Sequence, residues 1–450
     1  MAFKSRLSLA QMSATFAEDS WGYVSPSQRE YAIIGLSQGT GFIEITDPDN
    51  PVIISIEPQP VNGRDMKVYQ NYVYSSVDSG PTFIYDVSDI DNGNITLVNT
   101  ISAGTHNIFI DEVSGFLYLA IGGPLDIYSL ADPVNPAFVG RWNGETHDTQ
   151  VMTYTSGPNA GKQIAFVFAG RSERLDIIDV TDKSNIVRIG TANYPSSAYT
   201  HQGWLSEDLQ YIYANDELDN IARTSIFDVG DLTNPVFIQD YAPGGTAVDH
   251  NLYVKGNYIY EANYSSGLRI LDASDPLNLV EVGHFDTYAL NNGPGFVGAW
   301  NVYPFFPSGN IIVSDRSGGL FVLDPLEAIS PASVADRNAG SNPASYTADA
   351  PVMGMPWSAS VDLTTSGHSM AQVVGFSSSA SLPLGSGQTV LVGGTRMLSF
   401  PMSAGPVANF SGNIPTNTAL VGTTLYTQAV HFGGVSPFAL SNAQDLTIGF

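Results

Sequence analysis

The first 330 residues of this chain repeat one unit seven times: a short apolar strand, a turn, a second strand, and then a turn built on a variant of D-x-x-N-P. The clearest copies of that turn lie at residues 46–51, 131–136, 230–235 and 274–278, and weaker copies stand at Asp89, Asp182 and Asp324. A repeat of about 40 to 50 residues with several strands and no helical period is typical of a β-propeller, in which each repeat forms one blade. The sequence therefore predicts an all-β chain with a seven-bladed β-propeller over residues 1–330.

The last repeat lacks the fourth strand that each blade needs. Its third strand covers residues 319–325, after which the pattern stops. Residues 3–9 precede the first repeat and alternate in character, so we expect this N-terminal strand to complete the last blade and close the ring. Closure of this kind removes a free sheet edge.

The composition changes near residues 325–336. Residues 335–450 contain only six charged side chains, and their alternating apolar runs are broken by Gly, Pro and Ser turns. This pattern indicates a small, Ig-like β-sandwich domain over residues 331–450. Its low charge leaves two interpretations open, a contact surface for a partner or merely a weakly charged domain rich in Ser and Thr.

The charge of the chain restricts its partners. Forty-three acidic against 17 basic residues give a formal net charge of −26, which would repel nucleic-acid phosphates and anionic lipid surfaces. We therefore expect no nucleic-acid partner. The acidity fits solubility in a salty or extracellular medium, and it also fits the attraction of cations such as divalent metals.

The chain contains no cysteine, which excludes disulfides, thiolate metal sites and thiol nucleophiles and suits a bacterial surface protein. No segment approaches the ~18 consecutive apolar residues of a membrane span, so we expect no transmembrane segment. The first twenty residues have no apolar core of the length that a signal peptide needs. We expect either a cytosolic protein or an exported one whose export signal is absent from the chain as given.

Segments 21–36, 106–110, 146–150, 199–205, 215–219 and 249–253 share features of one known group of proteins. Together they resemble the LVIVD-repeat bacterial cell-surface proteins and, more closely, the choice-of-anchor B family, and this resemblance covers residues 17–325. It implies an extracellular or cell-surface protein held by a C-terminal anchor, and it implies no particular activity. The segment after Asp336 resembles the C-terminal sandwich modules of large secreted proteins.

The histidines give the sharpest functional clue. Four of the seven stand at the start of the innermost strand in consecutive repeats, namely His106, His147, His201 and His250, while Trp21, Asp65 and Trp300 fill this position elsewhere. Innermost strands surround the channel of a propeller, so these residues are expected to meet at one rim. Loops after the second strands open on the same face and add the other candidate rim or ligand residues, which are Arg171, Asn215, Asp216, Glu217, Glu261 and Asp315.

Two interpretations of the four histidines stay open. Neutral imidazoles are good ligands for Zn, Cu or Fe, so the rim could hold a transition metal, or Ca²⁺ among its carboxylates. Carboxylates beside the rings could also orient them or act as bases. Alternatively, a polar residue repeated at a strand start satisfies backbone groups of the next blade, and its recurrence reflects duplication. The recurrent Asp of the turns fits an Asx-turn better than a calcium site.

No G-x-S-x-G, phosphate-loop, H-E-x-x-H or dinucleotide motif occurs. We therefore favour a secreted or cell-surface binding or scaffolding protein over an enzyme. The propeller would take a ligand or partner, and the sandwich would attach to a cell-envelope or extracellular-matrix component or to a second copy. The alternative is a metalloenzyme, an oxidase or lyase, with its ion held by the four histidines at the central channel.

Overall fold

The computed structural model describes residues 1–60, 62–78, 80–326, 330, 332–338, 340, 342–415 and 420–449. The chain divides into two compact units, Met1–Leu326 and Glu327–Phe450. Strands dominate both units, and a short 3-10 turn, Ile90–Asn92, interrupts those of the first. No helix in the described ranges has the length and apolar character needed to cross a membrane.

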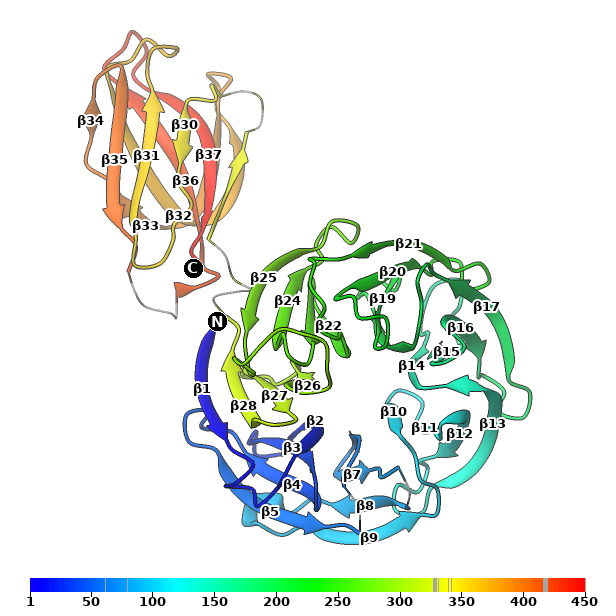
Figure 1. Cartoon of the computed structure of the whole chain (residues 1–450). Coiled ribbons are helices and arrows are strands. Elements are labelled where there is room, and N and C mark those ends of the chain that lie inside the picture. The colour runs from blue at the N-terminus through cyan, green and yellow to red at the C-terminus, as the bar shows by residue number, and fades with distance from the viewer. Residues whose placement is uncertain are drawn as a thin grey trace. The chain divides into compact units, whose positions relative to one another are not determined.

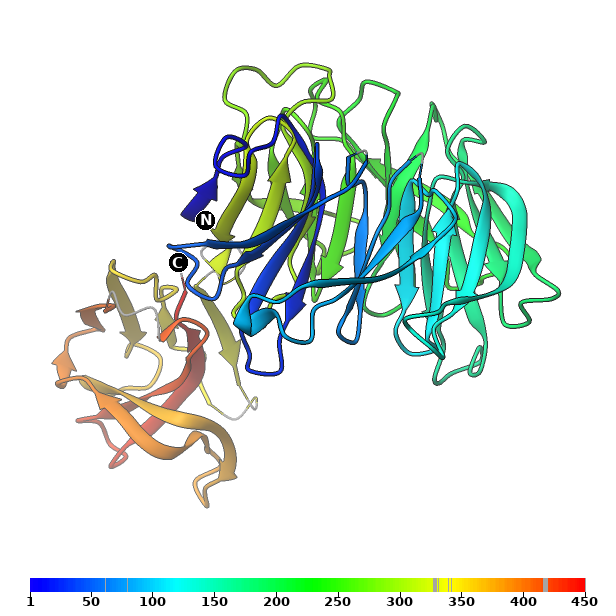
Figure 2. The same cartoon turned by 90° about the horizontal axis from the view of Figure 1, so that it is seen from below.

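The described part of the first unit forms seven four-stranded antiparallel sheets arranged in a ring (Figure 1). From the innermost strand outward, the first sheet contains β2 (Ala17–Val24), β3 (Glu30–Leu36), β4 (Gly39–Glu44) and β5 (Val52–Pro58), and the second contains β6 (Met66–Tyr69), β7 (Tyr72–Ser75), β8 (Thr82–Asp86) and β9 (Thr96–Ile101). The third sheet contains β10 (Asn107–Asp111), β11 (Phe116–Ala120), β12 (Gly123–Ser129) and β13 (Ala137–Thr146). The fourth sheet contains β14 (Asp148–Thr153), β15 (Gln163–Phe168), β16 (Arg174–Asp179) and β17 (Val187–Asn193). The remaining sheets are β18 (Thr200–Leu205), β19 (Tyr211–Asp216), β20 (Thr224–Asp228) and β21 (Val236–Tyr241); β22 (Asn251–Lys255), β23 (Tyr258–Ala262), β24 (Leu268–Asp272) and β25 (Val280–Phe285); and β26 (Ala299–Tyr303), β27 (Ile311–Asp315), β28 (Gly319–Asp324) and β1 (Ala2–Leu7). This is a β-propeller, so the all-β fold predicted from the repeat is confirmed. Figure 2 shows the ring from its edge, with the strands running between its two faces.

Neighbouring sheets share their cores. Ile34 and Ile43 of the first sheet pack in one buried cluster with Leu320 and Val322 of the last sheet. Strand β3 is buried along its whole length, which explains why its sequence is a continuous apolar run rather than an alternating one. Each sheet therefore depends on its neighbours for the burial of its faces.

The N-terminal strand completes the sheet of the last repeat. Strand β1 pairs antiparallel with β28, and Leu7 lies opposite Leu320. This pairing agrees with the strand predicted for residues 3–9. Because the first and last segments of the propeller share one sheet, the ring is joined by backbone hydrogen bonds rather than left open.

The recurrent Asp turns connect the third and fourth strands, and at two clear copies the Asp side chain binds only neighbouring groups. Asp132 Oδ1 accepts the Val134 N–H at 3.1 Å, and Asp132 Oδ2 accepts the side-chain amide of Asn135 at 3.0 Å. Asp275 accepts the Leu277 N–H at 3.1 Å and the Asn278 amide at 2.7 Å. The predicted Asx-turn role is confirmed at these positions.

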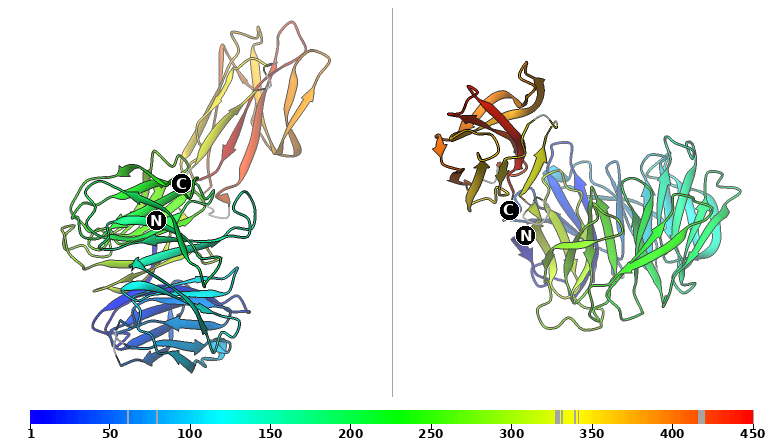
Figure 3. Two further views of the ribbon diagram at one scale, coloured as in Figure 1. Left: turned by 90° about the vertical axis from the view of Figure 1, so that its right-hand side faces the viewer. Right: turned by 90° about the horizontal axis from the view of Figure 1, so that it is seen from above.

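The second unit contains two sheets with a common core. One sheet has the order β29 (Ser333–Arg337), β37 (Ala439–Thr447), β36 (Thr424–Phe432), β32 (Met370–Pro383) and β33 (Thr389–Ser399), with β34 (Ser403–Ala404) paired to β32; the other has the order β30 (Tyr346–Ala348), β31 (Pro356–Asp362) and β35 (Val407–Asn413). Trp357 and Phe410 of the smaller sheet pack with Val373 of the larger one. Figure 3 shows these strands from two further directions.

Candidate functional site

Four histidines lie in a row at one end of the propeller channel. His106 directly precedes β10, His147 joins β13 to β14, His201 lies in β18, and His250 directly precedes β22. Ring centroids are 4.9 Å apart for His106 and His147, 4.2 Å for His147 and His201, and 4.2 Å for His201 and His250. The inner strands thus bring together side chains from four repeats, and we call these four residues the histidine row.

Backbone carbonyl groups hold the Nδ1 atoms of three rings in the row. His147 Nδ1 lies 2.9 Å from the carbonyl oxygen of His201, and His201 Nδ1 lies 2.9 Å from that of His250. His250 Nδ1 lies 2.6 Å from the carbonyl oxygen of Trp300. A carbonyl only accepts hydrogen bonds, so each Nδ1 carries the proton and donates it. In the neutral ring, Nε2 is then unprotonated.

Burial keeps these three rings neutral. Their exposed fractions are 8% for His147, 3% for His201 and 2% for His250. Burial lowers the pKa of His201 to about 3, and the nearby His106 and Arg64 act in the same direction. Burial and the neighbouring His201 hold the pKa values of His147 and His250 well below the usual range. The row therefore offers unprotonated Nε2 atoms at neutral pH.

The first ring of the row is bound differently. His106 Nδ1 lies 2.8 Å from Asp78 Oδ1, and His106 Nε2 lies 3.0 Å from a guanidinium nitrogen of Arg64. A guanidinium only donates, so Arg64 donates to Nε2 while Nδ1 donates to the carboxylate. Both ring nitrogens of His106 are thus engaged by protein groups.

Glu217 faces the other end of the row. Its Oε2 lies 3.7 Å from His201 Nε2, and its Oε1 lies 3.8 Å from His250 Nε2. The Tyr264 hydroxyl donates a hydrogen bond to Oε1 at 2.8 Å. Burial raises the pKa of Glu217, and the Tyr264 hydrogen bond partly offsets that rise. One donor atom from each of His201, Glu217 and His250 lies within 4.8 Å of the other two, close enough for a metal ion to be held between them.

Trp300 ends the row, and the guanidinium groups of two arginines lie over its ring. Its ring centroid is 4.7 Å from that of His250, and the guanidinium carbons of Arg64 and Arg316 lie 4.8 and 5.0 Å from its centroid. Arg64 also pairs with Glu18 at 2.9 Å. The rim therefore carries arginines as well as the carboxylates of Glu18, Asp78 and Glu217.

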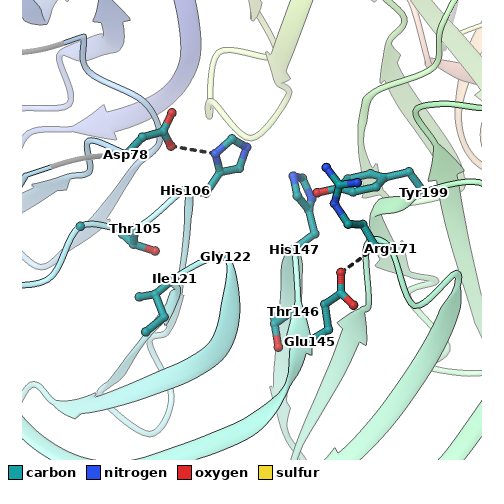
Figure 4. Close-up of a pocket in the computed structure, with 11 residues that line it drawn as sticks. Asp78, Thr105, His106, Ile121, Gly122, Glu145, Thr146, His147, Arg171 and Tyr199 are labelled. Carbon is teal, nitrogen blue, oxygen red and sulfur yellow. Dashed lines mark hydrogen bonds and ion pairs between the residues drawn. The ribbon is translucent and has the colours of Figure 1, made fainter.

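A pocket of about 280 Å³ opens between the third and fourth sheets beside the row (Figure 4). It is lined by polar and apolar residues, which are Asp78, Gly104, Thr105, His106, Ile121, Gly122, Glu145, Thr146, His147, Arg171 and Tyr199. Figure 4 shows Arg171 beside Tyr199 and His147. The Arg171 backbone N–H donates to Glu145 at 2.8 Å, and its guanidinium has no hydrogen-bond or ion-pair partner among the described residues. This guanidinium is exposed and available to a ligand.

The rim position assigned to Asp65 by sequence is occupied by Arg64. The Arg64 N–H bonds the Ser76 carbonyl at 2.9 Å, just as the His106 N–H bonds the Ala120 carbonyl at 3.1 Å. Asp65 lies one residue further along the strand. Its carboxylate accepts the Ile108 N–H at 2.6 Å and pairs with Lys67 at 2.5 Å.

Trp21 also lies away from the row. Its ring contacts Tyr253 and Tyr303, with centroid distances of 5.7 and 4.9 Å. Strand β2 carries an irregularity between Ala17 and Ser20, which shifts the residues that follow it relative to the other inner strands. Trp300 alone among the three predicted substitutes for histidine contacts the row.

Asp216 and Asp315 accept hydrogen bonds from nearby groups, and neither lines the pocket beside the row. Asp216 accepts the Tyr194 hydroxyl at 2.7 Å and the N–H groups of Ala198 and Tyr199 at 2.8 and 2.9 Å. These bonds order the segment before β18, including the pocket residue Tyr199. Asp315 Oδ1 accepts the N–H groups of the turn between β27 and β28, from Ser317 at 2.8 Å and Gly318 at 2.5 Å.

Glu261 lies at a different pocket, between the fifth and sixth sheets. It accepts hydrogen bonds from the Thr224 hydroxyl and, at 3.0 Å, from the Asn263 amide. Burial raises the pKa of Glu261 to about 7. This second pocket has a volume of about 390 Å³ and includes none of the histidines of the row. Of the predicted loop residues, Arg171 lines the pocket beside the row, and Glu217 faces the row itself.

Several rim residues were not predicted from the sequence: Arg64, Asp78, Tyr199, Tyr264 and Arg316. Tyr264 and Arg316 follow second strands of their sheets, as Arg171 and Glu217 do, and that shared position is a signal that could have found them. Arg64 was missed because the alignment of its repeat was wrong by one residue.

One repeat of the chain matches a known family of repeats. The sequence profile of the LVIVD repeat matches residues 244–287, which contain the whole sheet β22 to β25. A search of curated proteins gave no match. Similar solved structures include U3-55K, at 8% identity and a TM-score of 0.49 over 68% of this chain and 95% of that one. A protein from Lactobacillus plantarum matches at 12% identity and a TM-score of 0.49, over 83% of this chain and 96% of that one. The periplasmic gluconolactonase of Pseudomonas aeruginosa matches at 15% identity and a TM-score of 0.44, over 59% and 86%.

Proposed function

We propose that this protein is a secreted or cell-surface binding protein, a seven-bladed β-propeller that takes up a small polar ligand at the channel end that carries the histidine row. The seven four-stranded sheets support the blade count. The observation that carries the binding role is the pocket beside the row, where the guanidinium of Arg171 has no partner among the described residues and His147 offers an unprotonated Nε2.

The groups around this pocket favour a particular ligand chemistry. The Arg171 guanidinium can donate two parallel hydrogen bonds to a carboxylate. His147 Nε2 can accept a hydrogen bond from a hydroxyl, and the Tyr199 ring provides an apolar face near both. At about 280 Å³, the pocket lies near the lower end of the ~300–1,000 Å³ of small-molecule sites. A hydroxylated carboxylate such as a sugar acid combines these features.

The second unit and the location complete the proposal. Two sheets with a common core support an Ig-like β-sandwich over residues 331–450, joined to a propeller over residues 1–330. The low charge of this domain supports a role in attachment to a cell-envelope or extracellular-matrix component, or in self-association. The net charge of −26 supports an extracellular location.

The test is a thermal-shift screen of sugar acids and other hydroxylated carboxylates, with the matched neutral sugars beside them, followed by calorimetric titration of each hit. A charge-assisted hydrogen bond contributes about 1.5–3 kcal/mol, so Arg171→Ala should weaken a hit by roughly 10- to 100-fold. Arg396→Ala is the matched control, because it removes the same charge from an exposed site on the second unit. Equal affinities of the two variants, or binding of the neutral sugars alone, would contradict the proposal.

A further inference from the structure

We infer that the propeller binds one divalent transition-metal ion at the end of the histidine row remote from His106, with His201, His250 and Glu217 as its protein ligands. This inference does not rest on the ligand proposed for the pocket, because none of these three residues lines that pocket.

The donor atoms lie only slightly further apart than the ligands of a bound metal ion. The carboxylate oxygens of Glu217 lie 3.7 Å from His201 Nε2 and 3.8 Å from His250 Nε2, and the three donors lie within 4.8 Å of one another. Ligands at about 2.0–2.1 Å from a tetrahedral ion are about 3.4 Å apart. Side-chain rotations that bring the donors together by about 0.3 to 1.4 Å would complete the coordination.

Hydrogen bonds already orient each donor toward the ion. His201 and His250 donate Nδ1–H to backbone carbonyl groups, which leaves both Nε2 atoms unprotonated and fixes the planes of the rings. Glu217 is held by the Tyr264 hydroxyl at 2.8 Å. Metal-bound histidines in proteins almost always have such a partner on the second nitrogen, and metal-bound carboxylates are likewise hydrogen-bonded. The site would therefore need little reorganisation on binding.

The other two histidines of the row, His106 and His147, are not ligands of the ion. Both nitrogens of His106 are engaged, by Asp78 at 2.8 Å and by Arg64 at 3.0 Å. His147 lies outside the group of donors that are mutually within reach. The ion would consequently have three protein ligands rather than four imidazoles, and an open coordination position is typical of sites where a metal meets a substrate.

The surrounding charges indicate what fills the open position. Arg64 is paired with Glu18 at 2.9 Å and lies 3.7 Å from Asp78, so its charge is largely compensated. Arg316 has no carboxylate partner among the described residues and lies over Trp300, next to His250. A divalent ion with one carboxylate ligand beside an uncompensated guanidinium favours an anion, such as hydroxide or a ligand carboxylate, as its fourth ligand.

The donor set also restricts the metal. Two imidazoles and one carboxylate suit Zn²⁺, Cu²⁺ or Fe²⁺ better than Ca²⁺, which prefers six to eight oxygen ligands. The sequence left open an alternative function as a metal-dependent oxidase or lyase. An ion at this position would supply the Lewis acid that such an enzyme requires.

The experiment uses full-length, tag-free protein that has been treated with chelator and dialysed. Calorimetric titration with Zn²⁺ should show one ion per chain, and the visible spectrum of the Co²⁺ form should report nitrogen and oxygen coordination. His201→Ala, His250→Ala and Glu217→Gln should each weaken Zn²⁺ binding by at least ~100-fold, and Tyr264→Phe should weaken it by ~10- to 100-fold, the usual effect of a lost outer partner. His284→Ala, which changes an exposed histidine, should leave the affinity unchanged.

Two further variants separate the alternatives. His106→Ala should leave Zn²⁺ affinity nearly unchanged, and a loss equal to that of His201→Ala would overturn the three-residue site in favour of the whole row. Arg171→Ala should not alter Zn²⁺ binding, which distinguishes failure of the ligand pocket from failure of the metal site. Absence of Zn²⁺ and Co²⁺ binding by the wild type, or unchanged binding by all three ligand variants, would overturn the inference. Thermal unfolding of each metal-free variant checks that it is folded, and Glu217→Gln preserves the side-chain shape should an alanine variant fail to fold.

Discussion

The histidine row and the group of residues next to it along the inner strands differ sharply in charge, although they come from adjacent sequence positions. His147 is followed by Asp148, and the rim residue Arg64 is followed by Asp65. In the row, the three buried rings are neutral. One position further along, Asp65 and Asp148 belong to a charge cluster with Asp19 and Lys67.

The charge cluster shows what it costs to place several carboxyl groups together inside a protein. Asp19, Asp65 and Lys67 are 4%, 2% and 6% exposed. Burial, reinforced by Asp65, raises the pKa of Asp148 to about 8 and that of Asp19 well above its usual value. One ammonium group cannot compensate three carboxylates, so some of the carboxyl groups keep their protons.

The histidine row and the charge cluster are expected to have different roles, the row in binding and the charge cluster in stability. His147 of the row has an unprotonated Nε2 atom, and the guanidinium of Arg171 beside the row has no partner among the described residues; both residues line the pocket. Asp65, in the charge cluster, binds Lys67 and the backbone of the neighbouring sheet. We therefore expect changes in the charge cluster to affect folding and changes in the row to affect ligand or metal binding.

The largest effect should come from Lys67→Met. This substitution removes the ammonium that compensates Asp65 and leaves buried carboxyl groups without a counterion, a change that typically costs ~3–5 kcal/mol. Urea denaturation at pH 7 measures the loss in the free energy of unfolding. Lys4→Met is the matched control, because Lys4 pairs with Asp324 at the partly exposed outer edge, where an ion pair contributes about 0–1 kcal/mol. Equal losses in the two variants would show that the charge cluster does not carry the stability assigned to it.

A smaller effect should appear in the pH dependence of Asp19→Asn. The raised pKa means that folded Asp19 still binds a proton above pH ~4, where the unfolded chain has lost it, so this group makes stability fall as the pH rises from about 4. Asparagine keeps the oxygen that accepts the Ser20 N–H and removes the titration. The free energy of unfolding at pH 5 and pH 7 should therefore fall less in the variant than in the wild type, and a steeper fall in the variant would contradict the assignment.

The interior of the sheets was predictable because it depends on local sequence patterns. The third strand expected at residues 319–325 of the last repeat corresponds to β28, and the N-terminal strand pairs with it where the missing strand was predicted. Alternating and continuous apolar runs determine such strands within a few residues. Asx-turns are equally local, since Asp132 and Asp275 bind only residues two or three positions away.

The rim was less predictable because it depends on irregular strand ends and on contacts between sheets. One register shift lies at His201 in β18 and another at Trp300 in β26. Each adds a residue at the start of the innermost strand, which is the position that the sequence comparison of the repeats relied on. This explains why Asp65 was placed on the rim in the position of Arg64. The bond that fixes each of the three buried imidazoles comes from a carbonyl group of the next sheet, about 50 residues away, and no pattern within one repeat specifies it.

The smallest effect on stability should come from His106→Ala, which tests the comparison at a residue of the histidine row. The His106 ring is 28% exposed, and its partners Asp78 and Arg64 would keep other contacts, because Arg64 also pairs with Glu18. Loss of hydrogen bonds at such an exposed position should cost about 1 kcal/mol or less in the free energy of unfolding.

Urea denaturation, as used for Lys67→Met, decides between a binding role and a structural role for the histidine row. A loss for His106→Ala well below that for Lys67→Met, together with weaker ligand binding, would show that His106 lies on a binding surface. A loss of similar size would mean that the row holds the sheets together as the charge cluster does, and that its recurrence in four repeats reflects structure. The two substitutions change side chains on the inner strands of neighbouring sheets, Lys67 in β6 and His106 just before β10. The ratio of their effects therefore compares the structural interior of the propeller with its binding rim.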